Sequence, residues 1–419
     1  MEPSSSHFLS GKSIIIAGAG MAGLSFVAAL HKHWDSRLPP PRVSIYERDT
    51  EEVSVGREGY SLSINGIDKD GGLYTLMQLG LLDRTLAHAI IGMEGTGCFK
   101  VWTEDWKELI SIRQKPVKGL PTSTIRIARK NLRRILVDTV SEVTQIEWGE
   151  SCVSATRLED NRVRVQIVDS VTGETHDEEC DLLIAADGSS SKIRAALRPD
   201  DKLQYAGAVQ MGGLARFDGP LPPPVDLNWG GVLTKSGSFV FFSPVSKSEI
   251  VWALSVREKQ PRGPFNNKDL TQVQGMLSEA AELGKTLGPP FPLILEKTVP
   301  DTTLLLPARD KMPFRHRDVQ SSGPVVFIGD SNHAVSPFAG NGANLALRDG
   351  WDLAEQLCRS ASLVDAMGKY DALSEPRALA TLKSSHQRID MGHNTGLKYW
   401  AYRSFMTFGG YMLWITGRS

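Results

Sequence analysis

The sequence has few cysteines, no excess of either charge and few long apolar runs. Its four cysteines lie far apart without any C-x-x-C pair, which argues against a zinc site or a disulfide framework and is typical of a reducing compartment. Lysine plus arginine number 47 and aspartate plus glutamate 48, so charge gives no case for binding nucleic acid or an anionic membrane. We therefore expect a globular, cytoplasmic protein without a metal centre or a nucleic-acid partner.

Neither end of the chain has the pattern of a membrane-spanning segment. The N-terminal "MEPSSSHFLSGK" is polar and carries little positive charge, so it does not resemble a signal peptide. The apolar segment 404–416, "SFMTFGGYMLWIT", is shorter than the ~20 residues needed to cross a bilayer. We interpret it as a packing or surface-docking segment, with peripheral membrane contact as the alternative.

The chain of 419 residues is long enough for two or three domains of roughly 100–200 residues each. A β-α-β pattern occupies the start, strand patterns fill the middle, and a buried strand followed by a helix returns near residue 325. This order predicts an α/β fold, in which an α+β domain with an antiparallel sheet interrupts a Rossmann-type domain and helices end the chain. The expected Rossmann-type parts are 11–85, 120–200 and 305–365, the second domain is 86–119 and 201–304, and the C-terminal helical segment is 366–419.

A glycine motif lies directly between the first predicted strand, 13–17, and the helix that follows it. Gly18 allows a tight turn, Gly20 lets the backbone approach a pyrophosphate, and Gly23 lets the helix pack against the strand. Glu47 ends the next predicted strand, close to the spacing expected for an acid that binds ribose hydroxyls. This order indicates a dinucleotide site, and the alternative is a glycine-rich turn of any α/β protein.

The segment 327–350, "FIGDSNHAVSPFAGNGANLALRDG", begins as a buried strand and ends as a helix. An acid at the strand end can accept a hydrogen bond from a ribityl or ribose hydroxyl. Proline and glycine keep the next turn thin, and the first amides of the helix would direct partial positive charge at a ligand such as an isoalloxazine ring. The alternative is a helix cap and an ordinary turn. The residues of this prediction are Asp330, Pro337, Gly340, Gly342, Ala343 and Asn344.

A third buried strand, "DLLIAA", ends at Asp187 and Gly188. The serines at 189–191 can cap the helix that follows. On its own, an Asp-Gly pair at a strand end is usually just a turn.

Together these motifs resemble those of the class A flavoprotein monooxygenases, the para-hydroxybenzoate hydroxylase-like group. The glycine motif, the "DG" motif in "AADGSSSKIR" and the "GD" motif in "GDSNHAVSPFAGNGAN" occur in the family's order, and the similarity covers essentially the whole chain. The family also carries an R-x-x-L arginine that holds FAD, and Arg129 in "RKNL" matches it. "GREGYSLSING", "LQYAGAVQMGGLARF" and "GSFVFFSP" are most similar to the tetracycline-inactivating branch and to fungal secondary-metabolite hydroxylases.

The resemblance implies a flavoprotein monooxygenase that binds FAD and uses NADPH or NADH as co-substrate. It implies that O2 adds at flavin C4a and that the hydroperoxide hydroxylates or epoxidises an aromatic, enolic or polycyclic small molecule, in secondary metabolism. The pocket would exclude water from this intermediate. The alternatives are an FAD-dependent oxidase or dehydrogenase on the same fold and a non-catalytic binding protein. A halogenase is not expected, because the sequence has no W-x-W-x-I-P segment.

The resemblance also implies catalytic and further cofactor residues. Arg57 matches a loop arginine that lies near the flavin and nicotinamide in related enzymes, and its alternative is a solvated loop arginine. Arg194 and Tyr205 fall where some fungal relatives place residues proposed as catalytic. Arg48 and Gly59 join the expected FAD contacts.

Other polar and aromatic residues have a structural alternative. We interpret His333 and Asn332 as hydrogen-bonded structural groups rather than catalysts. An aromatic residue on a strand is more often part of the core than of a pocket. The expected walls of the substrate pocket are Arg216, Trp229, Phe241 and Phe242.

Overall fold

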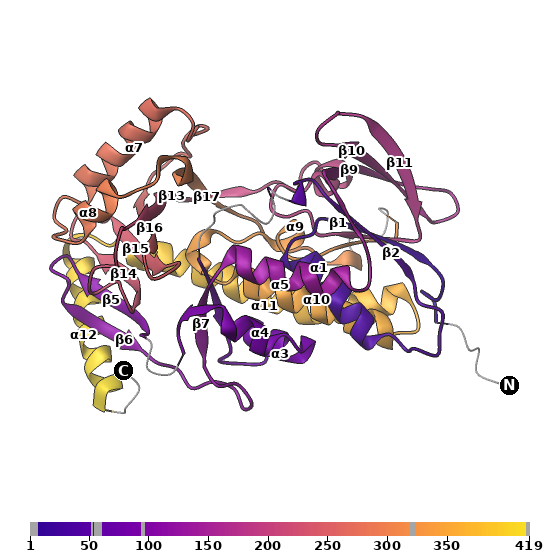
Figure 1. The fold of residues 1–419 in the computed structure, drawn as a ribbon, viewed down its shortest axis with the longest axis horizontal. Coiled ribbons are helices and arrows are strands. Elements are labelled where there is room, and N and C mark those ends of the chain that lie inside the picture. Colours follow the sequence, from indigo (N-terminus) through magenta and orange to yellow (C-terminus); the bar gives the residue numbers. More distant parts are fainter. Residues whose placement is uncertain (1–6, 52, 54–60, 94–96, 318–322, 416–419) are drawn as a thin grey trace.

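The computed structural model describes residues 7–51, 53, 61–93, 97–317 and 323–415. The predictions for Arg57 and Gly59 concern residues outside this part of the chain. Figure 1 shows one unit built around a parallel sheet, on the right, and a second unit built on a larger sheet, on the left.

A five-stranded parallel sheet forms the centre of the first unit. Its order is β18 (Val325–Phe327), β12 (Leu182–Ala185), β1 (Ser13–Ala17), β2 (Arg42–Glu47) and β8 (Ile146–Trp148). Strands β1 and β12 are apolar runs because both faces of the sheet are covered. Ile14 and Ile16 pack with the helices of one face, whereas Ile15 packs against a small sheet on the other. The helices are α1 (Met21–His33), α5 (Arg129–Ser141) and α10 (Gly342–Arg359), and the small sheet is β9 (Glu150–Arg157), β10 (Val163–Asp169) and β11 (Thr175–Cys180).

A second three-stranded sheet extends the core of this unit. Its order is β3 (Ser61–Asn65), β7 (Thr124–Ala128) and β4 (Ala89–Ile91), and the helices α3 (Gly72–Leu79) and α4 (Leu82–Ala87) lie between β3 and β4 in the chain. Ile64 and Ile125 from these strands join the same core cluster as Ile14. The pairing of β4 with β7 therefore ties residues 89–91 to the first unit, although they fall in a range expected for the second.

A seven-stranded sheet forms the second unit and is antiparallel except where β14 pairs with β5. Its order is β17 (Leu304–Asp310), β13 (Gln204–Arg216), β16 (Glu249–Arg257), β15 (Phe239–Pro244), β14 (Trp229–Leu233), β5 (Phe99–Thr103) and β6 (Glu108–Ile112). Helices α7 (Leu270–Leu283) and α8 (Phe291–Glu296) cover one face, and Trp102, Phe242 and Trp252 form the core there. Strand β17 extends this sheet past the boundary expected at residue 304.

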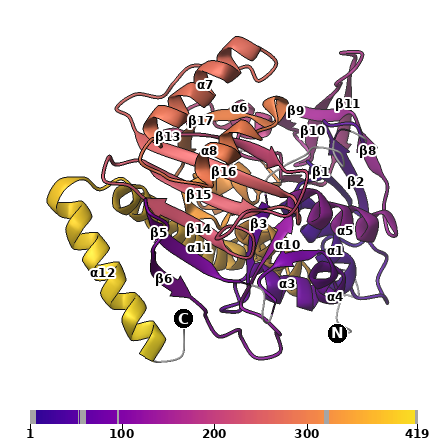
Figure 2. The same cartoon turned by 60° about the vertical axis from the view of Figure 1, so that its left-hand side comes forward.

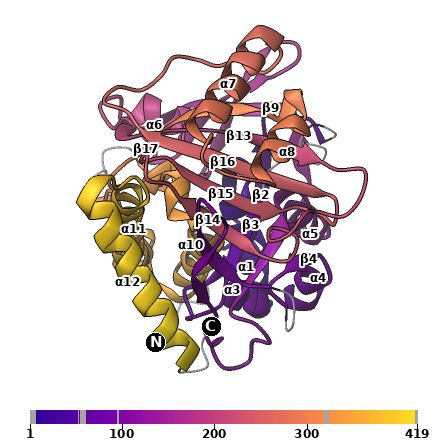
Figure 3. The same ribbon diagram turned by 90° about the vertical axis from the view of Figure 1, so that its left-hand side faces the viewer.

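Two long helices end the described part of the chain, α11 (Leu363–Gly392) and α12 (Gly396–Ile415). Helix α11 contacts both units, because Arg377 pairs with Asp349 of α10 and Asp390 pairs with Arg257 of β16. Helix α12 packs against β6 at the edge of the seven-stranded sheet (Figures 2 and 3). The short elements are α6 (Lys192–Leu197), α9 (Asp330–His333), η1 (Pro300–Thr302) and η3 (Pro337–Ala339).

The predicted fold class is confirmed. A parallel α/β unit is interrupted by a unit built on a largely antiparallel sheet, and helices follow at the C-terminal end. Within the described ranges, no helix combines the length and the apolar content needed to cross a membrane.

Candidate functional site

A cavity of about 1980 Å³ lies where the two units meet. Its walls include residues from all three expected motifs, from the seven-stranded sheet and from α11 and α12. The fold therefore brings segments from opposite ends of the chain to a shared space. From the motifs come Gly20, Asp187, Gly188, Asp330, Pro337 and Gly342.

The glycine turn between β1 and α1 packs closely against the end of β12. Gly18 has a φ of +105°, and a Cβ atom there would lie 2.7 Å from the carbonyl oxygen of Ala186. A Cβ atom at Gly23 would lie 2.3 Å from the carbonyl oxygen of Gly18, so the close approach of α1 requires glycine there. Gly20 is the N-cap of α1 and lines the cavity with Met21. The start of α1 is thus positioned to face an anion such as a pyrophosphate.

Glu47 lies at the end of β2 and is buried beneath this turn. Its Oε2 accepts hydrogen bonds from the Ala19 backbone N–H and from Arg133 Nη2, both at 3.0 Å. Arg133 Nε donates in turn to the carbonyl oxygen of Ala19 at 3.0 Å. Glu47 therefore orders the turn, and its carboxylate keeps lone pairs for a ribose hydroxyl. The next residue, Arg48, lines the cavity with a largely exposed side chain.

Arg133 was not among the residues predicted from the sequence. The predicted R-x-x-L arginine, Arg129, is the first residue of α5 and lines the cavity. Arg133 lies four residues further along the helix, so the two arginines share one face. That spacing was the signal that could have identified Arg133.

Asp187 lines the cavity and bonds to the start of the short helix α6, whose N-cap is Ser191. Its Oδ2 accepts hydrogen bonds from the backbone N–H groups of Lys192 at 2.8 Å and Ile193 at 3.2 Å. Its Oδ1 is buried and accepts no hydrogen bond from a described residue. Burial raises the pKa of Asp187. A buried acceptor without a donor, at a cavity wall, fits a ligand that supplies a hydroxyl or an N–H group.

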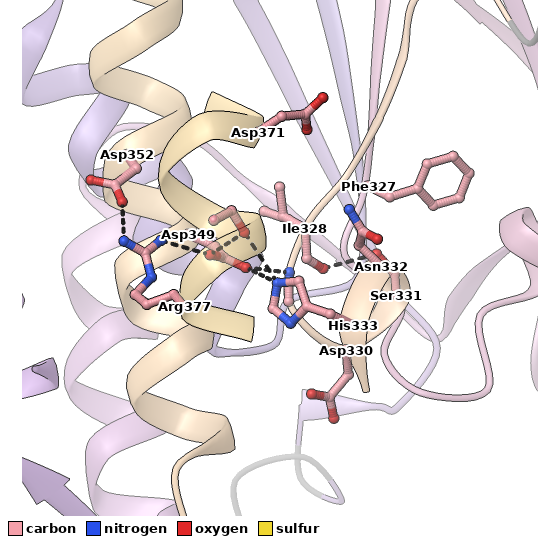
Figure 4. A network of polar contacts seen from close by, with 12 residues as sticks. Phe327, Ile328, Asp330, Ser331, Asn332, His333, Asp349, Asp352, Asp371 and Arg377 are labelled. Atoms are coloured by element: carbon pink, nitrogen blue, oxygen red, sulfur yellow. Dashed lines mark hydrogen bonds and ion pairs between the residues drawn. The ribbon is translucent and has the colours of Figure 1, made fainter. Parts of the chain in front are cut away.

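Asp330 begins α9 directly after the turn that follows β18. Its backbone carbonyl accepts from Arg194, whereas its carboxylate lines the cavity and receives no hydrogen bond from the described residues. Burial raises the pKa of Asp330. Figure 4 shows its carboxylate directed away from the neighbouring polar cluster. Asp330 therefore presents a second acceptor to a ligand.

The N-terminus of α10 reaches the same cavity. Gly340 has a φ of +59°, which favours glycine, and Gly342 and Ala343 line the cavity as the first residues of α10. The Asn344 side chain is buried, and its Oδ1 accepts from the backbone N–H groups of Asn65 at 2.9 Å and Gly72 at 3.0 Å. Its side chain thus joins α10 to β3 and α3, while the preceding residues face the cavity.

A cluster of buried charged residues bonds to the turn that follows β18 (Figure 4). His333 Nε2 lies 2.5 Å from Asp349 Oδ2, which also accepts from the Gly329 backbone N–H at 2.9 Å. Asp349 Oδ1 accepts from Ser374 Oγ at 3.0 Å and from Arg377 Nη2 at 3.1 Å. Burial alone would lower the pKa of His333, but the Asp349 carboxylate raises it. Burial would raise the pKa of Asp349, but His333 and Arg377 lower it.

This cluster agrees with the interpretation of His333 as a hydrogen-bonded structural group. Asn332 is likewise held, since its Oδ1 accepts from the Phe314 backbone N–H at 3.0 Å and its Nδ2 donates to the Phe314 carbonyl at 3.1 Å. Asp349 and Arg377 were not predicted, because their partners lie on other elements.

Two of the expected catalytic residues lie behind the cavity wall rather than in it. Arg194 donates to the carbonyl oxygens of Ser189 at 2.5 Å and Ser331 at 2.8 Å, so it ties the "DG" turn to the "GD" turn. Tyr205 Oη donates to the carbonyl oxygen of Glu258 at 3.2 Å. Neither residue is part of the cavity wall formed by the described residues. A catalytic role for either stays a prediction.

The expected substrate residues divide between two faces of the seven-stranded sheet. Trp229 and Phe241 line the cavity, whereas Phe242 points into the core because successive side chains alternate across a strand. Arg216 lies at the end of β13, where its Nε is 2.8 Å from Glu249 Oε1. It does not contribute to the described cavity wall.

Arg126 of β7 is a cavity residue that the sequence analysis missed. Only 4% of it is exposed. Its Nε donates to Ser243 Oγ at 2.7 Å, its Nη2 donates to the Ser61 carbonyl at 2.7 Å, and its Nη1 donates to Ser63 Oγ. No local pattern in "STIRIARK" marks this arginine, and only its contacts with Phe241 and Ser243 of β15 show that it is buried at the cavity.

Comparisons with known proteins agree with this geometry. Residues 12–282 and 294–380 match the protein family described as "FAD binding domain". Monooxygenase cfoF from Aspergillus candidus is 44% identical over 394 residues, which is 93% of this chain and 94% of that protein.

Two solved structures share the fold. The structure of Klebsiella pneumoniae HpxO complexed with FAD and uric acid aligns with a TM-score of 0.74 at 21% identity, over 98% of this chain and 97% of that one. The crystal structure of tetracycline destructase Tet(55) aligns with a TM-score of 0.67 at 18% identity, over 97% of both chains.

Proposed function

The chain belongs to the FAD-binding-domain family of flavoprotein monooxygenases, and we propose that it hydroxylates or epoxidises an aromatic, enolic or polycyclic small molecule. NADPH or NADH would supply the electrons and O2 the transferred oxygen atom. One observation carries the proposal: the cofactor motifs and aromatic side chains of the seven-stranded sheet wall the same cavity. HpxO holds uric acid, Tet(55) is a tetracycline destructase, and cfoF is a fungal monooxygenase, which supports a ring-containing substrate of secondary metabolism.

The residues of the cavity fit FAD. The Gly18 turn has no room for a Cβ atom beside Ala186, and both Asp187 Oδ1 and the Asp330 carboxylate are left to accept from a ligand. We assign the ribose to Glu47, the pyrophosphate to the start of α1 and the ribityl chain to Asp330. When bound, FAD supplies the redox and oxygen-activating chemistry.

The protein itself contributes binding, orientation and exclusion of water. The N-terminus of α10 would stabilise negative charge on the flavin ring. Trp229 and Phe241 present apolar surface that would keep water from the reacting groups. Arg194 and Arg133 hold the turns that bear Asp330 and Gly20 in place.

The proposal is tested with the purified protein and a panel of phenolic, polyketide-like and alkaloid-like compounds. We expect a yellow protein whose NADPH or NADH consumption accelerates with some of these compounds, with label from ¹⁸O₂ appearing in the product. An absence of labelled product from every compound that accelerates oxidation would favour an oxidase or dehydrogenase. A colourless protein that does not take up FAD would favour a binding protein.

We also propose that the protein is cytoplasmic and that its helix α12 makes peripheral contact with a membrane surface. Its inner face, including Tyr399 and Met406, packs against the seven-stranded sheet, yet its outer face is apolar too. The helix carries Lys398 and Arg403 but no acid, and tryptophan and tyrosine side chains are favoured at lipid interfaces. The exposed large apolar residues of α12 are Leu397, Trp400, Phe405, Phe408, Tyr411, Met412, Trp414 and Ile415.

A further inference from the structure

We propose that Arg126 is the anion-binding group of the substrate subsite, so that the substrate binds as a phenolate, enolate or carboxylate with its negative charge at this guanidinium. This inference rests on the proposed function, and it names the class of substrate and the residue that selects it. Arg126 is buried, has no acidic partner among the described residues and lines the cavity.

Arg126 is a buried cation that is not paired with an acid. Among the described residues no carboxylate lies within ion-pair distance of it, and its hydrogen bonds go to a carbonyl oxygen and two serine hydroxyls. The two other buried arginines differ from it: Arg133 pairs with Glu47 at 3.0 Å, and Arg194 bonds to carbonyl oxygens but has the carboxylates of Asp201, Asp187 and Asp330 near enough to raise its pKa. No described acid acts on the pKa of Arg126 in this way. Burying a charge without an opposite charge is unfavourable, so an anionic ligand would recover interaction energy at Arg126.

The electrostatic environment of Arg126 agrees with this reading. Burial lowers its pKa to about 9, which still leaves the guanidinium protonated at neutral pH. A carboxylate neighbour would raise the pKa instead, as the acids around Arg377 do. An anion that enters the cavity would therefore stabilise a guanidinium that is already charged but lacks a counter-charge.

The guanidinium keeps donors for a ligand. Of its five N–H groups, three are used by Ser243, Ser63 and Ser61, which leaves one on each terminal nitrogen. Charge-assisted hydrogen bonds from such donors to a phenolate or carboxylate oxygen are stronger than neutral ones.

The apolar surroundings place an aromatic ring beside this cation. The Arg126 guanidinium lies 5.6 Å from the centroid of the Phe241 ring, and Phe241 lines the cavity together with Trp229. A ring system could pack against these side chains while its oxyanion contacts Arg126. Ser61 and Ser63 belong to the first unit and Ser243 to the second, so Arg126 lies where the cofactor and substrate walls meet.

Binding as an anion would also help the reaction. An oxygen atom that is transferred as an electrophile adds more readily to an electron-rich carbon, and ionisation makes a phenol or enol more electron-rich. A fixed cation lowers the pKa of a bound phenol or enol, whose proton passes to solvent. Arg126 would thus select substrates that ionise and hold them in the ionised form.

The test measures binding of a matched pair of probes to the FAD-loaded protein by calorimetry. The probes are 2-naphthoate and 2-naphthamide, which differ little in shape but differ in charge. We expect the protein to bind the anion on the order of 10- to 100-fold more tightly, and Arg126→Gln to lose that preference while retaining FAD. Arg164→Gln, a matched change at an exposed arginine of β10, should keep it. A preference that survives Arg126→Gln would overturn the proposal.

Two further measurements keep the test decisive if Arg126→Gln does not fold. Equal binding of the two probes by the unmodified protein refutes the anion subsite without any variant. Competition with NADP⁺ separates the two sources of an anion: displacement of 2-naphthoate only by NADP⁺, with no effect of 2-naphthol or other phenols, would assign Arg126 to the nicotinamide nucleotide instead. If ¹⁸O label still enters product while the probes bind equally, the subsite is wrong and the monooxygenase function stands.

Discussion

At the scale of single residues, the cavity presents carboxylate oxygens that have no donor among the described residues. The Asp330 carboxylate and Asp187 Oδ1 are acceptors of this kind. Arg126 at the same cavity has N–H groups left to donate. Buried polar groups in proteins are nearly always paired, so such groups at a cavity wall indicate contacts that a ligand completes.

Asp330→Ala should weaken FAD binding without unfolding the protein, because its carboxylate bonds to no described residue. Loss of a hydrogen bond to a charged group costs about 1.5–3 kcal/mol, so the Kd for FAD should rise on the order of 10- to 100-fold. Fluorescence quenching of added FAD measures this. Asp200→Ala, at an exposed acid, is the control, and equal FAD affinity in both variants would refute the assignment.

The His333–Asp349 pair should make stability depend on pH. His333 has a raised pKa, so its contribution is fully present below its unfolded value of about 6.5 and is lost as pH rises through the folded pKa. Asp349 has a lowered pKa, so its contribution is present above about pH 4 and is lost as pH falls through the folded pKa. The pair therefore stabilises most between about pH 4 and 6.5.

His333→Gln measures this contribution. Removal of one partner from a buried ion pair costs about 3 kcal/mol or more, so the variant should melt well below the unmodified protein at pH 6. The difference in melting temperature should shrink as pH rises above about 6.5, the pKa of the unfolded histidine, and should vanish once pH passes the raised pKa of folded His333. A difference that stays constant from pH 6 to 9 would show that His333 is neutral in the folded protein.

At the scale of elements, the turn between β1 and α1 separates a folding requirement from a binding requirement. Gly18→Ala places a side chain at a φ of +105° and puts its Cβ atom 2.7 Å from a backbone oxygen. We expect this substitution to lower the free energy of unfolding by more than about 1–2 kcal/mol. Gly20→Ala adds a Cβ atom at 3.9 Å from the nearest atom, with a φ of −81°. We expect Gly20→Ala to fold normally but to bind FAD weakly, as urea unfolding and flavin content would show together.

Helix α12 is the element with the most exposed apolar surface, and its proposed membrane contact is testable. Burial of a large apolar side chain is worth about 1.5–3 kcal/mol, so Phe405→Ser with Phe408→Ser should lower partition onto phosphatidylcholine vesicles by at least about 10-fold. Co-sedimentation with the vesicles measures this partition. The control is a variant with two serine substitutions at exposed positions of α7. Dimerisation that both substitutions abolish, without vesicle binding, would assign the face to a second copy of the chain.

At the scale of the whole molecule, FAD should couple the two units, because the cavity has walls from both and α11 contacts both. A ligand that binds only the folded state stabilises it by about 2.7 kcal/mol at a concentration 100 times its Kd. We therefore expect removal of FAD to lower the melting temperature by several degrees, measured by calorimetry. Equal melting temperatures with and without FAD would mean that the cofactor does not bind across these walls.

The sequence by itself determined the elements, their order and the family. Glycines at 18, 20 and 23 between an apolar strand and a helix express local rules of backbone conformation, and the structure has β1 and α1 on either side of them. The "DG" and "GD" turns could be placed at strand ends as well, because a strand that is buried on both faces is an apolar run in the sequence.

Only the tertiary structure decided which side chains meet. The partners of Arg133, Asp349 and Arg126 lie on other elements, far along the chain, and no local pattern specifies such pairs. Strand register placed Phe241 in the cavity and Phe242 in the core, and packing placed Arg216 outside the described cavity wall. Local conformation depends on neighbours in sequence, whereas burial and charge pairing depend on neighbours in space, so the substrate side of the cavity emerged only from the fold.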